Sequence, residues 1–262
     1  MSILVPGRIT GLVVMAIIVV LGIWALERAK RGKVRAVREL AGMAGLRIAA
    51  GRCAEMGRPF FHTTGHGGGG LYTARGPQHM AGIAILGYIA RLCAKLGVKA
   101  VSLTAFPELI PVTEDTIRMA YLGEGKADQV KPDMVRFLSS YALAFKQGYI
   151  GQLTREKAGA ASLCGAIWPS DALHMSEPGV IIGAMQIGGA IDTDTLSMLA
   201  LTCDYVFLGE ELYAAGAFAS ENPTQLSVMF ASDIVKIGLV LLMIFGFILS
   251  SAGVKIAQLF TI

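Results

Sequence analysis

Residues 58–106, RPFFHTTGHGGGGLYTARGPQHMAGIAILGYIARLCAKLGVKAVSLTAF, decide the expected fold of this chain. RPFFHTTG (58–65) is typical of a short strand, and the loop HGGGG (66–70) follows it. Residues 77–96 predict a helix that is apolar nearly all round, with a proline at its first position and a glycine after its last turn. VKAVSLTAF (98–106) predicts a buried strand. A strand, a helix and a strand in this order indicate two parallel strands joined by a crossover helix.

The same alternation of strands and helices continues after residue 106. Further strands are expected at 179–189 and 203–210, and further helices at 113–122, 131–159 and 193–202. Thr113 would cap the first of these helices, and the second fits either one piece or two pieces separated near Gly148. Residues 161–168 are small and apolar, and they fit a strand or a helix. The predicted fold class is therefore α/β, a Rossmann-like domain with a mostly parallel sheet of three to five strands.

Two charge-free apolar stretches lie on either side of this segment. They are ITGLVVMAIIVVLGIWAL (9–26) and IGLVLLMIFGFILSSAGV (237–254), and each is about long enough to cross a hydrocarbon core of roughly 30 Å as a helix. No small-residue cleavage site follows the first stretch, so a retained anchor is favoured over a cleaved signal peptide. A helical pattern runs from Pro223 to beyond Ser250, into the second stretch. We therefore expect a two-pass membrane protein with one N-terminal and one C-terminal transmembrane helix.

Basic residues gather just after the first apolar stretch. The cluster comprises Arg28, Lys30, Arg31, Lys33, Arg35 and Arg38. Positive charge stays on the cytoplasmic side of a membrane, so we expect the middle domain in the cytoplasm and both termini outside. Because the cluster lies next to a span, contact with anionic membrane lipid is favoured, and no nucleic-acid partner is expected.

These features divide the chain into four predicted parts. They are an N-terminal transmembrane anchor (1–27), a basic juxtamembrane helix (28–57), a cytoplasmic α/β domain (58–222), and a long helix that continues into the C-terminal anchor (223–262). Hydrophobic residues make up 54% of the chain and charged residues 16%, against about a quarter charged in soluble proteins. The middle domain can therefore build a full core and still bury apolar surface against other subunits.

The glycine-rich stretch after the first strand is the strongest candidate for a binding site. Glycines let a backbone turn expose its N–H groups, and a following helix N-terminus attracts anions, so a phosphate or a carboxylate fits there. The run is not expected to be GxGxxG in register, and the sequence holds no GxxxxGK(S/T) pattern. Residues 71–76 also separate the glycines from the helix, which weakens the site. The other interpretation is a flexible loop that lets neighbouring subunits pack closely. The candidate ligand-binding residues, which we name the glycine loop, are Thr63, Thr64, Gly65, His66, Gly67, Gly68, Gly69 and Gly70.

The other chemistry-bearing residues match no catalytic or metal motif. The spacing of His62, His66 and His79 fits no usual ligand frame. The four cysteines include no CxxC pair, as expected of reduced core thiols in a cytoplasmic domain. Carboxylates at strand ends, where α/β ligand sites form, include Glu108, Asp171, Asp192 and Asp194, of which the last two are explained by helix capping. We therefore predict no catalytic residue and no metal site, and the cofactor is unknown.

Four stretches are distinctive beside the N-terminal anchor and its basic tail. They are HTTGHGGGG (62–70), VSLTAFPE (101–108), GAMQIGG (183–189) and CDYVFLGEELYAAGA (203–217). With these features the chain resembles, over nearly its whole length, an uncharacterised prokaryotic family of membrane-anchored proteins known only as a domain of unknown function. The resemblance implies no agreed activity, so it transfers no site residues.

Two hypotheses for function follow. The first is a membrane-anchored scaffold or assembly protein whose cytoplasmic domain self-associates or docks partner proteins, because two anchors hold many copies in one plane. Small residues in the second apolar stretch, such as Gly238 and Gly246, would let helices pack closely in the bilayer. The alternative is a membrane-bound enzyme or sensor that binds a nucleotide or another phosphorylated ligand at residues 66–70. Membrane lipid, further copies of the chain and other membrane or cytoplasmic proteins are the expected partners.

Overall fold

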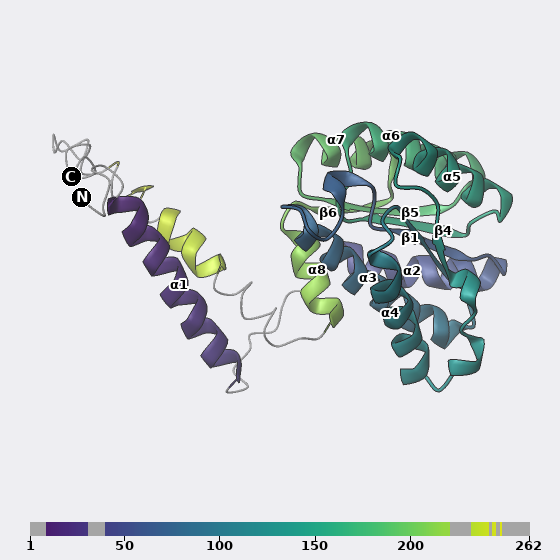
Figure 1. Ribbon diagram of the computed structural model, residues 1–262, viewed down its shortest axis with the longest axis horizontal. Helices are drawn as coiled ribbons and strands as arrows, with labels where there is room; N and C mark the ends of the chain where they lie inside the picture. The colour runs from purple at the N-terminus through teal and green to yellow at the C-terminus, as the bar shows by residue number, and fades with distance from the viewer. Residues whose placement is uncertain (1–8, 31–39, 221–231, 241–242, 245–246, 248–262) are drawn as a thin grey trace. The chain divides into compact units, whose positions relative to one another are not determined.

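The computed structural model describes residues 9–30, 40–220, 232–240, 243–244 and 247. The chain divides into two compact units, one of residues 38–220 and one of residues 1–37 with 221–262 (Figure 1). We name the first the α/β unit and the second the terminal unit. The glycine loop belongs to the α/β unit.

The strands of the α/β unit form one parallel sheet in the spatial order β3-β2-β1-β4-β5-β6. Their bounds are β1 Phe60–Thr63, β2 Ala100–Thr104, β3 Val135–Phe137, β4 Ala160–Cys164, β5 Met185–Ala190 and β6 Tyr205–Leu208. The four central strands are buried at every residue, as strands covered by helices on both faces must be. The Rossmann-like α/β prediction is confirmed, with six strands in place of the three to five expected.

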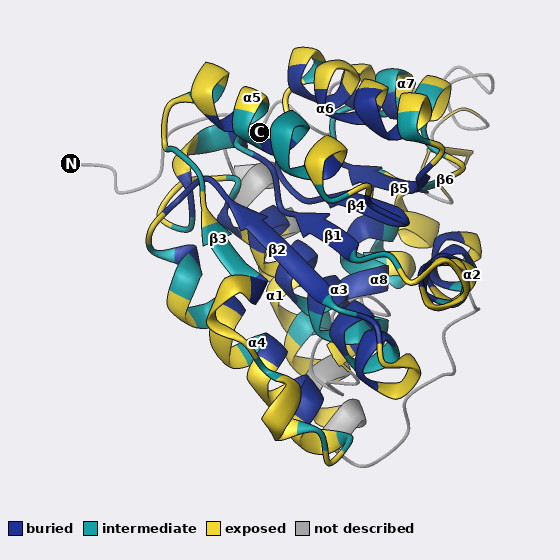
Figure 2. Cartoon of the chain, turned by 90° about the vertical axis from the view of Figure 1, so that its right-hand side faces the viewer, coloured by how far each residue is buried: buried dark blue, intermediate teal, exposed yellow. Residues whose placement is uncertain are grey.

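Helices cover both faces of this sheet (Figures 1 and 2). One face carries α2 (Ala41–Met56), α3 (Gly76–Leu96), α4 (Leu109–Gly123) and α8 (Glu211–Ser220), and the other carries α5 (Ala142–Arg155), α6 (Pro169–Ile182) and α7 (Thr193–Thr202). Parallel strands need a long crossover connection between them, and a helix supplies it here. Short 3-10 turns occur at Gly67–Gly69, Ala127–Gln129 and Pro132–Met134.

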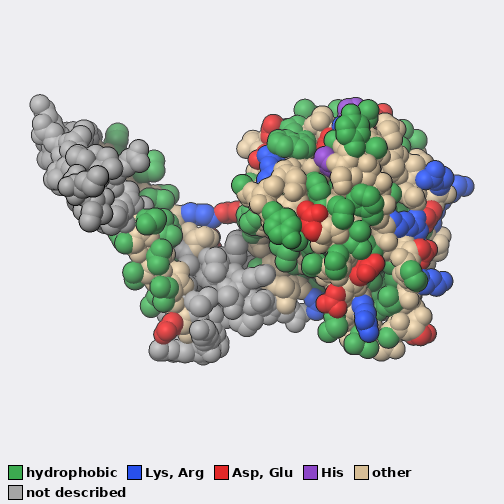
Figure 3. Space-filling view, viewed as in Figure 1, with side chains coloured by type: hydrophobic (Ala, Val, Ile, Leu, Met, Phe, Trp, Pro, Cys, Tyr) green, Lys and Arg blue, Asp and Glu red, His purple; other side chains and the backbone are tan. Residues whose placement is uncertain are grey.

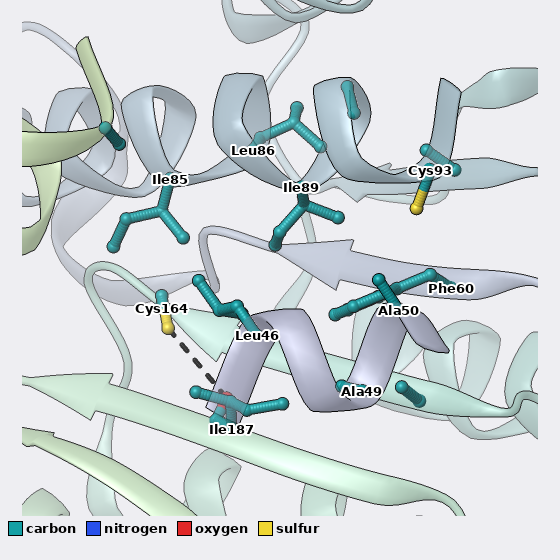
Figure 4. Packing of buried hydrophobic residues seen from close by; sticks show 14 of the residues in the cluster. Leu46, Ala49, Ala50, Phe60, Ile85, Leu86, Ile89, Cys93, Cys164 and Ile187 are labelled. Atoms are coloured by element: carbon teal, nitrogen blue, oxygen red, sulfur yellow. Dashed lines mark hydrogen bonds between the residues drawn. The ribbon is translucent and has the colours of Figure 1, made fainter. Parts of the chain in front are cut away.

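The core consists of two apolar clusters, one on each side of the sheet. Figure 4 shows the first, in which Leu46 and Ala50 of α2 and Ile85 and Ile89 of α3 pack around Phe60 of β1. These side chains are fully buried. Phe60 and the residue after it point to opposite faces of the sheet, as alternation along a strand dictates. The central strand β1 is therefore held from both sides.

Several expected boundaries are wrong, each for a physical reason. The helix expected at 113–122 begins at Leu109, and Thr113 lies inside it, where its hydroxyl donates to the Leu109 carbonyl oxygen at 2.6 Å. The segment 131–159 holds β3 and then α5, which crosses Gly148 without a break. Residues 179–182 end α6 rather than begin a strand, because Gly183 at φ +69° closes that helix.

In the terminal unit, α1 (Ile9–Lys30) covers the first apolar stretch. Residues 232–240 are helical, as are 243, 244 and 247, and the rest of the second apolar stretch lies outside the described residues, as does 223–231. Among the described helices, α3 alone has the length and composition of a membrane span, and just over half of it is buried in the α/β unit. It is a core helix by its burial. The two flanking transmembrane helices and the cytoplasmic location therefore stay predictions.

Candidate functional site

The glycine loop lies where the two halves of the sheet diverge. From β1 the chain passes to β2 on one side, and β4, the other neighbour of β1, leads to β5 and β6. In such open sheets ligands bind outside the carboxyl ends of the strands at this switch point. The glycine loop follows β1 directly, and the loop that starts at Gly165 follows β4. The predicted site residues therefore occupy the place where an α/β fold of this order puts its ligand.

The first half of the glycine loop is closed onto the loop after β4. The Gly67 N–H donates to the Ala166 carbonyl oxygen at 2.7 Å, and the Ala166 N–H donates to the Thr64 carbonyl oxygen at 3.0 Å. A Cβ at Gly65, whose φ is +81°, would lie 2.3 Å from the Ala166 carbonyl oxygen. Close packing within the α/β unit therefore accounts for Gly65 and Gly67.

The second half of the loop faces charged side chains. Gly68, Gly69 and Gly70 all have positive φ. A Cβ at Gly68 would meet the Arg75 side chain, and a Cβ at Gly70 would come 1.9 Å from Oε1 of Glu108. At Gly69 only the Thr73 methyl is near, at 3.3 Å. This bare backbone therefore lies between a cation at one end and a carboxylate at the other.

Two histidines make hydrogen bonds that hold the glycine loop in place. His66 Nε2 donates to the Ser140 carbonyl oxygen at 2.7 Å, and His79 Nε2 donates to the Gly67 carbonyl oxygen at 3.0 Å. Both rings pack on Phe106, His66 stacked at 5.3 Å between centroids and His79 edge-on at 5.6 Å. Burial lowers the pKa of His79. Nε2 of each ring is used in these bonds, and both Nδ1 atoms are buried without a partner among the described residues.

A buried ion pair lies at the same edge, on the face covered by α5 and α6. Lys146 Nζ is 2.9 Å from Oδ1 of Asp171, whose side chain is 3% exposed. The other carboxylate oxygen, Oδ2, has no partner among the described residues. The strand-end position of Asp171 is visible in the sequence, but its pairing with Lys146 is not, because the two belong to different helices.

Arg75 connects the glycine loop with the loops after β4 and β5. Its Nη1 lies 2.5 Å from Oδ2 of Asp192, and its guanidinium carbon lies 4.2 Å from the centroid of the Trp168 ring. Asp192 stands at the N-cap position of α7, yet its side chain makes no capping hydrogen bond. Capping therefore does not explain Asp192. Sequence reasoning missed this pair because 117 positions separate its members, and only the strand order brings them together.

A polar row crosses the middle of the sheet beneath α3. His62 of β1 is in register with Ser102 of β2 and Ser162 of β4, and all three are buried. Burial lowers the pKa of His62 to about 3, against a weaker opposing effect of the Gly82 backbone. Neither ring nitrogen has a hydrogen bond of normal geometry among the described residues. The row lies below the glycine loop, and no sequence motif marks it.

The cysteine thiols and the clustering of possible metal ligands bear on the chemistry of this site. Burial raises the pKa of Cys53, Cys164 and Cys203 to about 12, so these thiols stay protonated, and thiolate is the reactive form. Across the part of the chain that the structure describes, no three His, Cys, Asp or Glu side chains gather as a metal site requires. Polar backbone, one carboxylate and one guanidinium are the groups that the loop offers to a ligand.

The expectation that the run lacks GxGxxG is wrong, because Gly65, Gly67 and Gly70 have this spacing. The helix differs from that of a dinucleotide fingerprint, because α3 does not follow the glycines directly and begins at Gly76. A helix N-terminus directly after the glycines supplies the positive end of the helix dipole to a pyrophosphate. Here that contribution is displaced, and Arg75 stands immediately before the helix instead.

Comparison with known protein families gives a match that covers nearly the whole chain. A family model described as "Domain of unknown function (DUF6754)" matches residues 2–260. No curated protein and no solved structure matches the chain. The match covers nearly the whole sequence, including the strand, loop and helix that carry the candidate site. The chain therefore belongs to the DUF6754 family, a domain of unknown function.

Proposed function

We propose that the α/β unit binds a nucleotide or another phosphorylated small molecule at the glycine loop. The observation that carries this proposal is the position of the loop, which leaves β1 at the switch point of a sheet of order 3-2-1-4-5-6. This is the place where open parallel sheets bind ligands. The Nδ1 atoms of His66 and His79, buried and without partners among the described residues, are polar groups that a bound ligand can satisfy at the same location.

The charged side chains at the two ends of the loop favour one orientation of the ligand. The Glu108 carboxylate lies against Gly70, where it repels a phosphate and accepts hydrogen bonds from hydroxyl groups. A ribose therefore fits the Gly70 end, and the phosphate fits the Gly68 end. This division favours a nucleotide, or another ligand that carries both a sugar hydroxyl and a phosphate, over inorganic phosphate.

The direct test measures binding of a panel of nucleotides to the full chain in detergent by isothermal titration calorimetry. Gly69→Ala places a methyl group over the open part of the loop, and we expect it to weaken binding roughly tenfold or more. Gly125→Ala is the matched control, because Gly125 also has positive φ, at +70°, and nothing within 4 Å of its Cβ position. Both variants carry the same backbone strain. Absence of binding by the wild type, or equal affinity in the two variants, would overturn the proposal.

A membrane-anchored scaffold is the second proposal, and it is compatible with the first. It is supported by exposed apolar side chains on the described part of the terminal unit (Figure 3), among them Met15, Val20, Ile237 and Phe247. Surface of this kind requires a partner, either lipid or another chain. We expect a particle that contains several copies when the protein is extracted gently from membranes. A strict monomer would contradict self-association, and the proteins that co-purify would identify docked partners.

A further inference from the structure

Arg75 lies between three loops at the carboxyl edge of the sheet. It directly precedes α3, it pairs with Asp192 after β5, and it stacks on Trp168 after β4. Its aliphatic part lies against the glycine loop, since a Cβ at Gly68 would be 2.6 Å from Cδ of Arg75. One cation therefore joins the glycine loop to the other half of the sheet, across the switch point.

The guanidinium of Arg75 retains donors for a second anion. The Asp192 contact uses Nη1, and among the described residues no other hydrogen bond involves this guanidinium. A guanidinium that stacks on an indole keeps its edge open for hydrogen bonds. Its planar fork matches the oxygens of a phosphate in a bidentate way. The side chain is 21% exposed, so a ligand at the loop can reach it.

Asp192 has the properties of an exchangeable counter-ion. It stands at the N-cap of α7 without capping it, so the contact with Arg75 is its only side-chain hydrogen bond among the described residues. Its side chain is 34% exposed, and partly solvated ion pairs exchange partners at little cost. The other carboxylate beside the loop, Glu108, lies at Gly70, at the end away from Arg75.

We propose that Arg75 binds the phosphate of the ligand and that Asp192 competes with the ligand for Arg75. The inference rests on the proposed ligand-binding function and names the residue that recognises the anion. A phosphate carries more negative charge than a carboxylate and accepts two parallel hydrogen bonds, so it displaces Asp192. Because Arg75 lies over the Trp168 ring, this exchange changes the surroundings of that indole.

The experiment follows Trp168 fluorescence while inorganic pyrophosphate or a nucleotide is added to the full chain in detergent. The chain has two tryptophans, so a Trp24→Phe background leaves Trp168 as the only reporter. Asp192→Asn removes the competing charge and keeps a good N-cap residue, and we expect roughly tenfold tighter pyrophosphate binding. Arg75→Gln should abolish the response, and Arg75→Lys, which keeps the charge without the fork, should bind more weakly than the parent.

Asp133→Asn is the matched control, because it removes a carboxylate from the Lys99 ion pair at the opposite edge of the sheet, and it should leave binding unchanged. Unchanged or weaker pyrophosphate binding in Asp192→Asn would overturn the inference. Wild-type nucleotide affinity in Arg75→Gln, measured by calorimetry, would overturn the inference and leave the proposed function standing. If neither pyrophosphate nor any nucleotide binds the parent or Asp192→Asn, both proposals fail together.

Discussion

His62 occupies the middle of the sheet with a serine on each neighbouring strand. A neutral imidazole costs far less to bury there than an imidazolium, which would be a buried charge without a counter-ion. This explains the direction of its pKa shift, from 6.5 to about 3. The residue therefore makes the stability of the α/β unit depend on pH.

We predict that the His62 contribution to stability is complete above about pH 6.5 and falls as the pH is lowered toward 3. In this window the unfolded chain binds a proton that the folded chain does not, so the free energy of unfolding drops by up to about 1.4 kcal/mol per pH unit. His62→Gln should lack this component. Unfolding of both proteins by urea at pH 5 and pH 7 would measure it. An equal pH dependence in the two proteins would contradict the assignment.

Alanine substitutions at Gly67 and Gly123 distinguish close packing at one glycine from the general effect of replacing a glycine. A Cβ at Gly67 would lie 2.8 Å from the Ala166 backbone, whereas Gly123, at the end of α4, has nothing within 4 Å. Gly67→Ala should destabilise by about 1–3 kcal/mol, since backbone cannot move aside as a side chain can. Gly123→Ala should be neutral or stabilise by up to about 1 kcal/mol. Thermal unfolding followed by circular dichroism compares them, and equal shifts would count against the close approach.

At the scale of elements, the Lys146–Asp171 pair couples α5 to α6. We predict that Lys146→Met destabilises by about 3–5 kcal/mol, because it leaves a buried carboxylate without its cation. The double variant Lys146→Met with Asp171→Leu should recover most of that loss. Lys95→Met, which breaks the exposed Lys95–Glu124 pair, should cost less than about 1 kcal/mol. A double variant as unstable as Lys146→Met would show that packing, not the stranded charge, dominates.

Elements with strong local signals could be predicted, and those defined by tertiary contacts could not. β1, α3 and β2 were predicted because proline, glycine and long apolar runs mark them in sequence. β3 was missed because it has three residues and none of them is buried, so it carries no apolar run. α6 carries no clear helical pattern in the sequence, because prolines stand at its start and inside it, at Pro169 and Pro178. Burial of its inner face overrides those local signals.

The candidate site shows the same division. Its glycines could be predicted from sequence, because glycine at positive φ is a local property. The side chains that surround the loop come from after β2, β4 and β5, and only the strand order brings Glu108, Trp168 and Asp192 to one edge. A single sequence holds no record of that order. The loop could therefore be identified, whereas the residues that would give it chemistry could not.

The whole molecule joins a Rossmann-like unit to terminal segments of apolar sequence. If both apolar stretches span a membrane as predicted, they hold the α/β unit in two dimensions with its partners, which raises their effective concentration. The proposed ligand site would then lie on a domain that is fixed at the membrane. This connection depends on the orientation of the chain, and that orientation can be tested.

We predict that the full chain stays in membranes during alkaline carbonate extraction, with both termini outside and the α/β unit in the cytoplasm. The basic residues between 28 and 38 favour this orientation, because positive charge is retained on the cytoplasmic side.

Cysteines introduced as Ser2→Cys and Thr261→Cys should react with a membrane-impermeant maleimide in intact cells. Asp128→Cys, at an exposed position of the α/β unit, should react only after lysis. The native thiols of Cys53, Cys93 and Cys164 are buried and give a low background, and Cys203, which is half-buried, is replaced by serine in all three variants. Labelling of Asp128→Cys in intact cells would show the opposite orientation. Release of the protein by carbonate would contradict membrane anchoring.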